Sequence, residues 1–180
     1  MGKAVAPGIF LCVLYVFLAA CMGGQDWRTA SRAPAGIAPS PDGHPEAILQ
    51  IYGAKAWGWR GIFAIHTWVA AKKTGESAYT VYEVVGWRLR QGLPAVRAAK
   101  DAPDRYWYGA KPRLLWEKRG PGVDDMIGAV EAAVKSYPWP ETYQAFPGPN
   151  SNTFTAWIIR NAPGLDARLP RTAIGSSYLP

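Results

Sequence analysis

The segment Pro147-Gly148-Pro149-Asn150-Ser151-Asn152-Thr153-Phe154 predicts the start of a helix. Two prolines and a glycine form a rigid turn, and apolar residues then recur with helical spacing at Phe154, Trp157 and Ile158. The helix therefore begins at Asn150 or Ser151. A hydroxyl at this position is either a helix cap or a nucleophile beside the N–H groups of the first turn. Both interpretations remain open from this segment alone.

Two strands joined by a short turn precede this helix. Residues 62–72 and 78–89 have strand composition, and the turn between them contains Gly75, which is typical of a hairpin. The first strand is mostly apolar on both faces, as expected for a central strand. It places His66 and Trp68 on one face and predicts that His66 is at least partly buried.

The second strand carries a carboxylate among apolar residues. Glu83 shares a face with Val81 and Val85, where a carboxylate is costly without a partner. A hairpin closed about Gly75 places position 66 opposite 83 or 84, so Glu83 is the first candidate to orient the imidazole of His66 and Tyr82 is the second. The structural alternative is a core histidine bonded to a backbone carbonyl, with Glu83 turned to solvent.

The remaining periodic segments complete an α+β fold. Residues 47–52, 105–108 and 113–117 are predicted strands, and residues 123–137 show helical spacing with two aspartates in the first turn. We therefore expect an antiparallel sheet with two or three helices packed against it.

Composition limits the chemistry that the domain can perform. The 180-residue chain has a net charge of +7 from scattered basic residues, which favours a membrane or wall surface over nucleic acid as partner. Its two cysteines, Cys12 and Cys21, precede the domain, and it has only two histidines, His44 and His66. We therefore expect neither a disulfide, a metal site nor a cofactor.

The N-terminus predicts export. Residues 1–20 carry one early charge and an apolar run that is short for a membrane span, as in a signal peptide. Leu18-Ala19-Ala20-Cys21 resembles the lipobox of bacterial lipoproteins, which implies that Cys21 is acylated and holds the protein on a membrane. The same resemblance associates a residue other than aspartate directly after the cysteine, here Met22, with sorting of the lipoprotein to the outer membrane. The alternative is an uncleaved short anchor helix that reaches Met22.

The rest of the chain divides into two parts. Residues 21–45 form the lipid anchor and a flexible tether, and residues 46–180 form one domain.

The order of a strand histidine, His66, followed by Asn150-Ser151-Asn152-Thr153-Phe154 resembles the circularly permuted branch of the papain-like superfamily, which includes NlpC-type and lecithin retinol acyltransferase-like proteins. There an Asn-Cys-x-x-Phe motif supplies a nucleophilic cysteine, and Ser151 stands in its place here. The whole stretch from about residue 48 to residue 179 also resembles an uncharacterised family of exported bacterial proteins, classed as a domain of unknown function. This second resemblance rests on Gly86-Trp87, on residues 148–154 and on Thr172-Ala173-Ile174-Gly175.

Two functions follow from these resemblances. The first is a serine-dependent hydrolase or acyl or amide transferase. Its expected site comprises Ser151 as nucleophile, His66 as base and Glu83 behind it, with Asn150, Asn152, Trp68 and Tyr82 as substrate contacts. The second is a non-catalytic envelope module that has lost the cysteine and binds peptidoglycan, lipid or an envelope protein.

Overall fold

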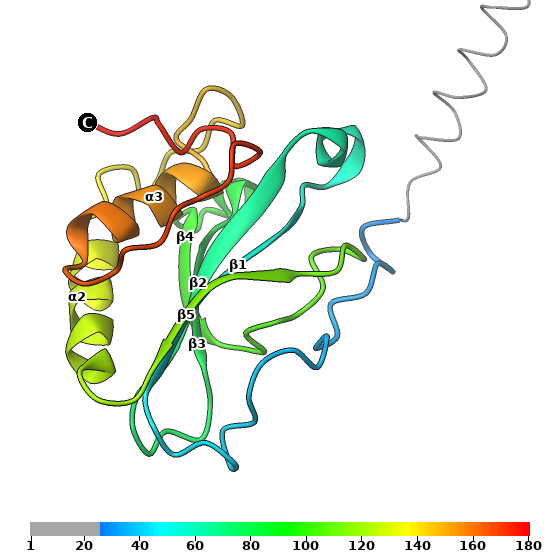
Figure 1. Ribbon diagram of the computed structural model, residues 1–180. Helices are drawn as coiled ribbons and strands as arrows, with labels where there is room; N and C mark the ends of the chain where they lie inside the picture. Colours follow the sequence, from blue (N-terminus) through cyan, green and yellow to red (C-terminus); the bar gives the residue numbers. More distant parts are fainter. Residues whose placement is uncertain (1–25) are drawn as a thin grey trace, which may run out of the picture.

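The computed structural model describes residues 26–180, which form a five-stranded antiparallel sheet with helices on one face (Figure 1). The strand order is β4-β3-β2-β1-β5. The α+β class and the antiparallel sheet are therefore confirmed. The elements are, in chain order, β1 (Ile48–Lys55), the 3-10 helix η1 (Gly58–Ile62), β2 (Ile65–Lys72), β3 (Thr80–Val84), the 3-10 helix η2 (Gly86–Gln91), β4 (Val96–Lys100), β5 (Arg113–Arg119), α2 (Val123–Lys135) and α3 (Ser151–Asn161).

Strand β2 lies at the centre of the sheet, as its two apolar faces predicted. In its pairing with β3, Val69 lies opposite Tyr82 and Ala70 lies opposite Val81. The observed register is therefore shifted by one or two residues from the predicted one, in which position 66 lies opposite 83 or 84. Continuing this register places Glu83 opposite Trp68 rather than His66. Residues 66 and 83 nevertheless project from the same face of the sheet. Residue 83 lies two positions from the residue opposite His66, and side chains two positions apart on a strand share a face.

The second strand of the hairpin is shorter than predicted, and β4 was not predicted. Strand β3 ends at Val84, and η2 begins at Gly86, whose Cα lies so close to the ring of Tyr143 that a side chain there would collide with it. Strand β4 consists of Val-Arg-Ala-Ala-Lys, in which small and charged residues mask the alternation that indicates a strand. The predicted strand at 105–108 is part of a loop and forms only isolated bridges, from Arg105 to Pro34 and from Trp107 to Ala110.

The two faces of the sheet support separate apolar clusters. One lies between the sheet and helices α2 and α3 and includes Leu49, Ile51, Val69, Phe154 and Ile158. The other lies on the opposite face, under the loop of residues 101–112, and includes Tyr52, Trp68, Ala70, Val81 and Trp107. Successive residues of β2 alternate between these clusters. The side of β2 on which a residue lies therefore decides whether it can meet α3.

The residues before the domain partly lie against this second face. Ala33 accepts a hydrogen bond from the N–H of Tyr106, Pro39 accepts one from the hydroxyl of Tyr79, and the carboxylate of Asp104 accepts from the N–H groups of Ile37 and Ala38. Much of the segment predicted as a tether therefore lies against the domain. The predicted signal peptide, Cys12 and Cys21 lie outside the described residues. Between residues 26 and 180, no helix combines the length and apolar character needed to cross a membrane.

Candidate functional site

Helix α3 begins where the sequence predicted, and Asn150 is its N-cap. The side-chain oxygen of Asn150 accepts hydrogen bonds from the N–H groups of Asn152 and Thr153, at 2.9 and 3.2 Å. The hydroxyl of Thr153 accepts in turn from the N–H of Asn150, at 3.1 Å, which completes a capping box. The oxygen of Asn150 is therefore occupied by the helix itself.

The C-terminal loop lies over the start of α3 and uses the remaining polar groups there. The side-chain NH₂ groups of Asn150 and Asn152 both donate to the carbonyl of Ile174, at 3.2 and 2.8 Å. The hydroxyl of Thr153 donates to the carbonyl of Gly175, at 2.7 Å. Gly175 has a φ of +92°, and a Cβ there would overlap the side chain of Asn150. The loop thus closes over the N-terminus of the helix.

Thr67 is the β2 residue that faces α3. Its hydroxyl lies 2.9 Å from the side-chain oxygen of Asn152, 2.9 Å from the hydroxyl of Thr155 and 3.5 Å from the carbonyl oxygen of Ser151. Asn152 also donates to the carbonyl of Ile65, at 2.9 Å. These buried polar groups join strand and helix and satisfy one another.

His66 lies on the other face of β2, where its ring is covered by a tryptophan. The ring centres of His66 and Trp107 are 3.5 Å apart and their planes differ by 6°. His66 is 7 % exposed. Its Nε2 lies 3.6 Å from the Oε2 of Glu83, slightly beyond hydrogen-bonding distance. The predicted proximity of His66 to Glu83 is therefore observed, across a diagonal of the strand pair.

Two arginines hold the carboxylate of Glu83. One Nη of Arg105 donates to both carboxylate oxygens at 2.7 Å, and Arg97 donates to Oε1 at 2.8 Å. Arg97 also donates to Asp101, at 3.0 Å. Sequence reasoning missed both arginines. A buried carboxylate requires a cationic partner, but that requirement does not indicate which loop supplies it.

The electrostatics of this cluster favour an ionised glutamate beside a neutral histidine. Burial raises the pKa of Glu83, but its contact with His66 and the charges of Arg105 and Arg97 outweigh burial and bring the pKa to about 2. Burial lowers the pKa of His66, and the positive charge of Arg105 lowers it further against the opposing effect of Glu83. Since the two arginines already neutralise Glu83, the imidazole remains uncharged.

The structure does not bring His66 and Ser151 together. His66 shares a face with Trp68 and Trp107, whereas α3 packs on the face that carries Thr67. The dyad predicted from the sequence requires both side chains in one hollow, and the sheet separates them.

The two other expected substrate contacts also have structural partners. Trp68 is fully buried and donates its indole N–H to the carbonyl of Pro103, at 2.7 Å. Tyr82 lies on the helix side of the sheet with its hydroxyl 3.4 Å from Glu131, so it cannot orient His66. In the described part of the chain, no group of three or more His, Cys, Asp or Glu side chains has the arrangement of a metal site.

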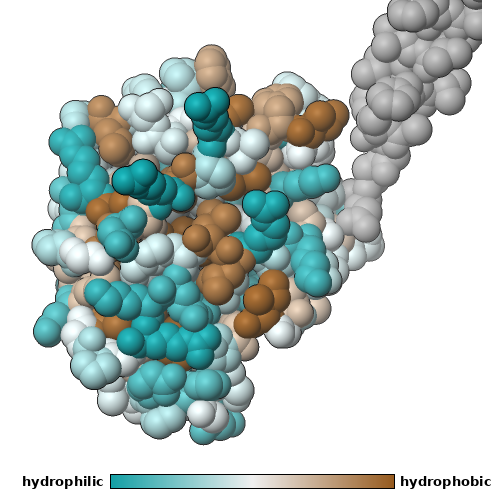
Figure 2. Space-filling view, viewed as in Figure 1, coloured by the Kyte–Doolittle hydropathy of each residue, from teal (hydrophilic) through white to brown (hydrophobic). Residues whose placement is uncertain are grey.

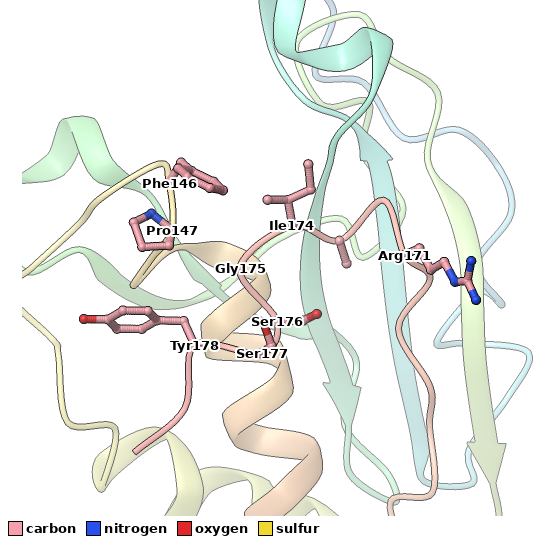
Figure 3. A pocket seen from close by; sticks show the side chains of 9 residues that line it. Phe146, Pro147, Arg171, Ile174, Gly175, Ser176, Ser177 and Tyr178 are labelled. Atoms are coloured by element: carbon pink, nitrogen blue, oxygen red, sulfur yellow. The ribbon is translucent and has the colours of Figure 1, made fainter.

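A hollow of ≈ 480 Å³ opens beside the C-terminal loop (Figure 3). Phe146 and Pro147 form one wall, and Tyr178 lies next to them. Ile174 and Arg171 lie on the opposite side, with Ser176 and Ser177 between. Phe146 is 73 % exposed. The hollow therefore has an exposed apolar ring on one side and Arg171 at its margin, where the guanidinium points outward (Figure 3). Sequence reasoning did not identify this hollow.

Comparison with known proteins identifies the family but no relative of known activity. Neither a search of the curated proteins nor a search of the solved structures finds a significant match. A family model described as "Protein of unknown function (DUF3750)" matches residues 46–178. This match covers nearly the whole predicted domain and agrees with the expected resemblance to an uncharacterised family. The chain therefore belongs to the DUF3750 family of proteins of unknown function.

Proposed function

We propose that this protein is a non-catalytic binding domain of the bacterial cell envelope, held by a lipid on Cys21 at a membrane surface, with the outer membrane as the favoured location. The observation that carries the non-catalytic part is the orientation of β2. His66, the base expected to activate Ser151, projects from the face opposite to α3, and Thr67 occupies the face that meets the helix. A serine hydroxyl needs a base within hydrogen-bonding reach to attack an acyl carbon.

We further propose that the domain derives from the permuted papain-like arrangement and retains its scaffold without its chemistry. The support is positional. A helix with Asn150 at its cap and Ser151 in its first turn packs on a central strand that precedes it in the chain. A dyad would require a histidine at the β2 position that faces this helix, and that position is Thr67. Serine and threonine therefore occupy the two positions that a cysteine and a histidine would need.

The side-chain amides of Asn150 and Asn152, which were expected to contact a substrate, bond within the protein instead, and this favours a ligand site elsewhere. Asn150 and Asn152 direct their NH₂ groups to backbone carbonyls, and the oxygen of Asn150 caps α3. The hollow beside the C-terminal loop is the better ligand surface, because Phe146 and Arg171 lie at its edge (Figure 3). An exposed apolar ring on one side of the hollow and a guanidinium at its outer margin suit a ligand with both methyl groups and a carboxylate, as in the peptide of peptidoglycan.

Labelling with a serine-directed fluorophosphonate tests the non-catalytic assignment. We expect the purified full chain and its Ser151→Ala variant to give the same background signal, while a known serine hydrolase in the same reaction is labelled. Labelling of the parent chain that disappears in Ser151→Ala would overturn the assignment.

Sedimentation with insoluble peptidoglycan tests the ligand surface. We expect the full chain to pellet with it and Arg171→Gln to reduce the pelleted fraction. Arg168→Gln is the matched control, because Arg168 is also exposed but does not line the hollow. Equal pelleting of the two variants would exclude the hollow as the peptidoglycan site.

A further inference from the structure

The η1 turn exposes three large apolar side chains that the core does not explain. Trp59 is 60 % exposed, Ile62 is 73 % exposed and Phe63 is 47 % exposed. The rings of Trp59 and Phe63 contact each other, with centres 5.5 Å apart, and no residue of η1 is buried. We call these three residues the η1 tip. Figure 2 shows apolar side chains at the upper right of the molecule, where Figure 1 places η1. Contiguous apolar surface of this kind is typical of an interaction site.

The surroundings of the η1 tip carry uncompensated positive charge. Arg60 lies within η1, Lys55 ends the strand before it, and Arg113 pairs with Gly53 near the end of β1. All three are exposed, and within residues 26–180 none forms an ion pair with a carboxylate. Residues 47–75 and 105–116 contain no aspartate or glutamate.

Several basic residues at the opposite end of the sheet are paired. Lys73, Lys100 and Arg119 pair with Glu131, Glu76 and Glu117 respectively, at 2.8 to 2.9 Å, whereas exposed Lys118 has no such pair within the described chain. The apolar tip is distinguished by having large exposed apolar side chains directly beside free cations. Apolar and aromatic side chains surrounded by Lys and Arg match the interface of an anionic bilayer, where rings enter the headgroup region and cations meet lipid phosphates.

We propose that the η1 tip is a membrane-docking element that enters the headgroup region of an anionic bilayer. This inference rests on the proposed lipid at Cys21. Asp26 lies five positions after Cys21, a reach of at most about 18 Å. In Figure 1 the first described residues, in blue, lie on the same right-hand side of the molecule as η1. An anchor at Cys21 therefore keeps the domain within reach of the lipid surface. The tip then fixes the orientation of the domain, so that the anchored protein has two contacts with the bilayer instead of one.

A polarity-sensitive fluorophore on a single introduced cysteine tests the proposal. The full chain is reconstituted into vesicles of phosphatidylethanolamine and phosphatidylglycerol, and flotation measures its association. Ile62→Cys carries the probe at the tip, and Trp59→Cys provides a second labelled position. Ser77→Cys is the matched control, because it is exposed in the β2–β3 turn at the far end of β2, about 25 Å from the tip along the strand. The chain without an added cysteine gives the blank.

We expect blue-shifted emission at positions 62 and 59, quenching there by nitroxide-labelled lipid, and an aqueous spectrum at position 77. The blue shift should be lost in vesicles of phosphatidylcholine alone. If the chain floats but all three positions remain aqueous, the docking element is excluded and the anchor survives. If the chain does not float, both proposals fail. A blue shift at the tip without lipid quenching would indicate a protein contact and would also overturn the membrane assignment.

Discussion

The imidazole of His66 lies flat against the indole of Trp107, with ring centres 3.5 Å apart. This stacking buries a histidine that lies on a central strand close to a carboxylate. The indole covers one side of the ring, and Glu83 beside its Nε2 is held by Arg105 and Arg97. A histidine and glutamate that the sequence suggests as half of a catalytic site are thus part of a buried charged cluster.

Removal of Trp107 should destabilise the domain and expose His66. Trp107 is 6 % exposed, so Trp107→Ala should lower the free energy of unfolding by about 3 to 5 kcal/mol. The His66 pKa should rise toward its ordinary value as water reaches the ring, which NMR titration measures. Trp59→Ala is the control, because Trp59 is largely exposed and its loss should change stability by less than about 0.5 kcal/mol. Equal effects of the two substitutions would contradict the role assigned to Trp107.

Stability should fall as the pH drops below the ordinary pKa of histidine. The pKa of His66 is lowered in the folded protein, chiefly by burial, so the unfolded chain binds more protons just below about pH 6.5. The free energy of unfolding should then decrease by at most about 1.4 kcal/mol per pH unit. Urea titrations at about pH 7.5 and about pH 5.5 measure this change. His66→Gln should reduce it, and an unchanged pH dependence in that variant would show that another group is responsible.

Glu83 should contribute far more to stability than an exposed glutamate in an ion pair. Glu83→Gln leaves Arg105 buried without its full counter-charge, which should cost about 3 to 5 kcal/mol. Glu76→Gln is the matched control. It breaks the exposed pair with Lys100, so it should cost less than about 1 kcal/mol. Thermal and urea unfolding measure both, and similar losses would argue against a buried charged cluster.

The lowered pKa of Glu83 also predicts a loss of stability in acid, at lower pH than the loss caused by His66. Its pKa of about 2 lies below the ordinary glutamate value of 4.5, so the stabilisation is fully present above about pH 4.5 and is lost as the pH falls toward 2. The shift corresponds to about 3 kcal/mol. Glu83→Gln should therefore flatten the dependence of stability on pH in the acid range. An equally steep acid limb in parent and variant would refute this.

Asn150→Ala should destabilise the start of α3 and release the C-terminal loop. Loss of a cap costs about 1 to 2 kcal/mol, and the variant also loses the bonds to the carbonyls of Ala145 and Ile174. Hydrogen exchange should accelerate at the N–H groups of Asn152 and Thr153, because these groups donate hydrogen bonds to the side-chain oxygen of Asn150 in the parent protein. Asn161→Ala removes a bond at the exposed end of the same helix and should leave these amides unchanged. Equal exchange in both variants would contradict the assigned cap.

The features predicted correctly from the sequence are those that local residues determine. Asn150 with Thr153 three positions later defines the start of α3, and the spacing of Met126, Ile127 and Val130 defines α2. The strands β1, β2 and β5 follow from their apolar composition. Strand β4 was missed because it has no run of large β-branched or aromatic residues.

The candidate site could not be predicted because it depends on which face of β2 receives α3. Both faces of β2 are apolar, so alternation shows that His66 and Thr67 point in opposite directions without showing which one meets the helix. The partners of Glu83 posed a similar problem. The hairpin restricts Glu83 to the neighbourhood of His66, but Arg105 reaches it from a loop 22 residues away in the chain.

The closure of the C-terminal loop over α3 has a consequence for the order in which the domain forms. Asn152 and Thr153 donate to carbonyls of residues 174 and 175, and the N–H of Ile65 at the start of β2 donates to the carbonyl of Thr172. Until residues 172–175 have been synthesised, the amide of Asn152 and the hydroxyl of Thr153 lack these acceptors, at the point where the helix meets the sheet. A nascent chain interrupted before Thr172 cannot complete this helix–sheet junction, so native packing there must await the synthesis of residues 172–175.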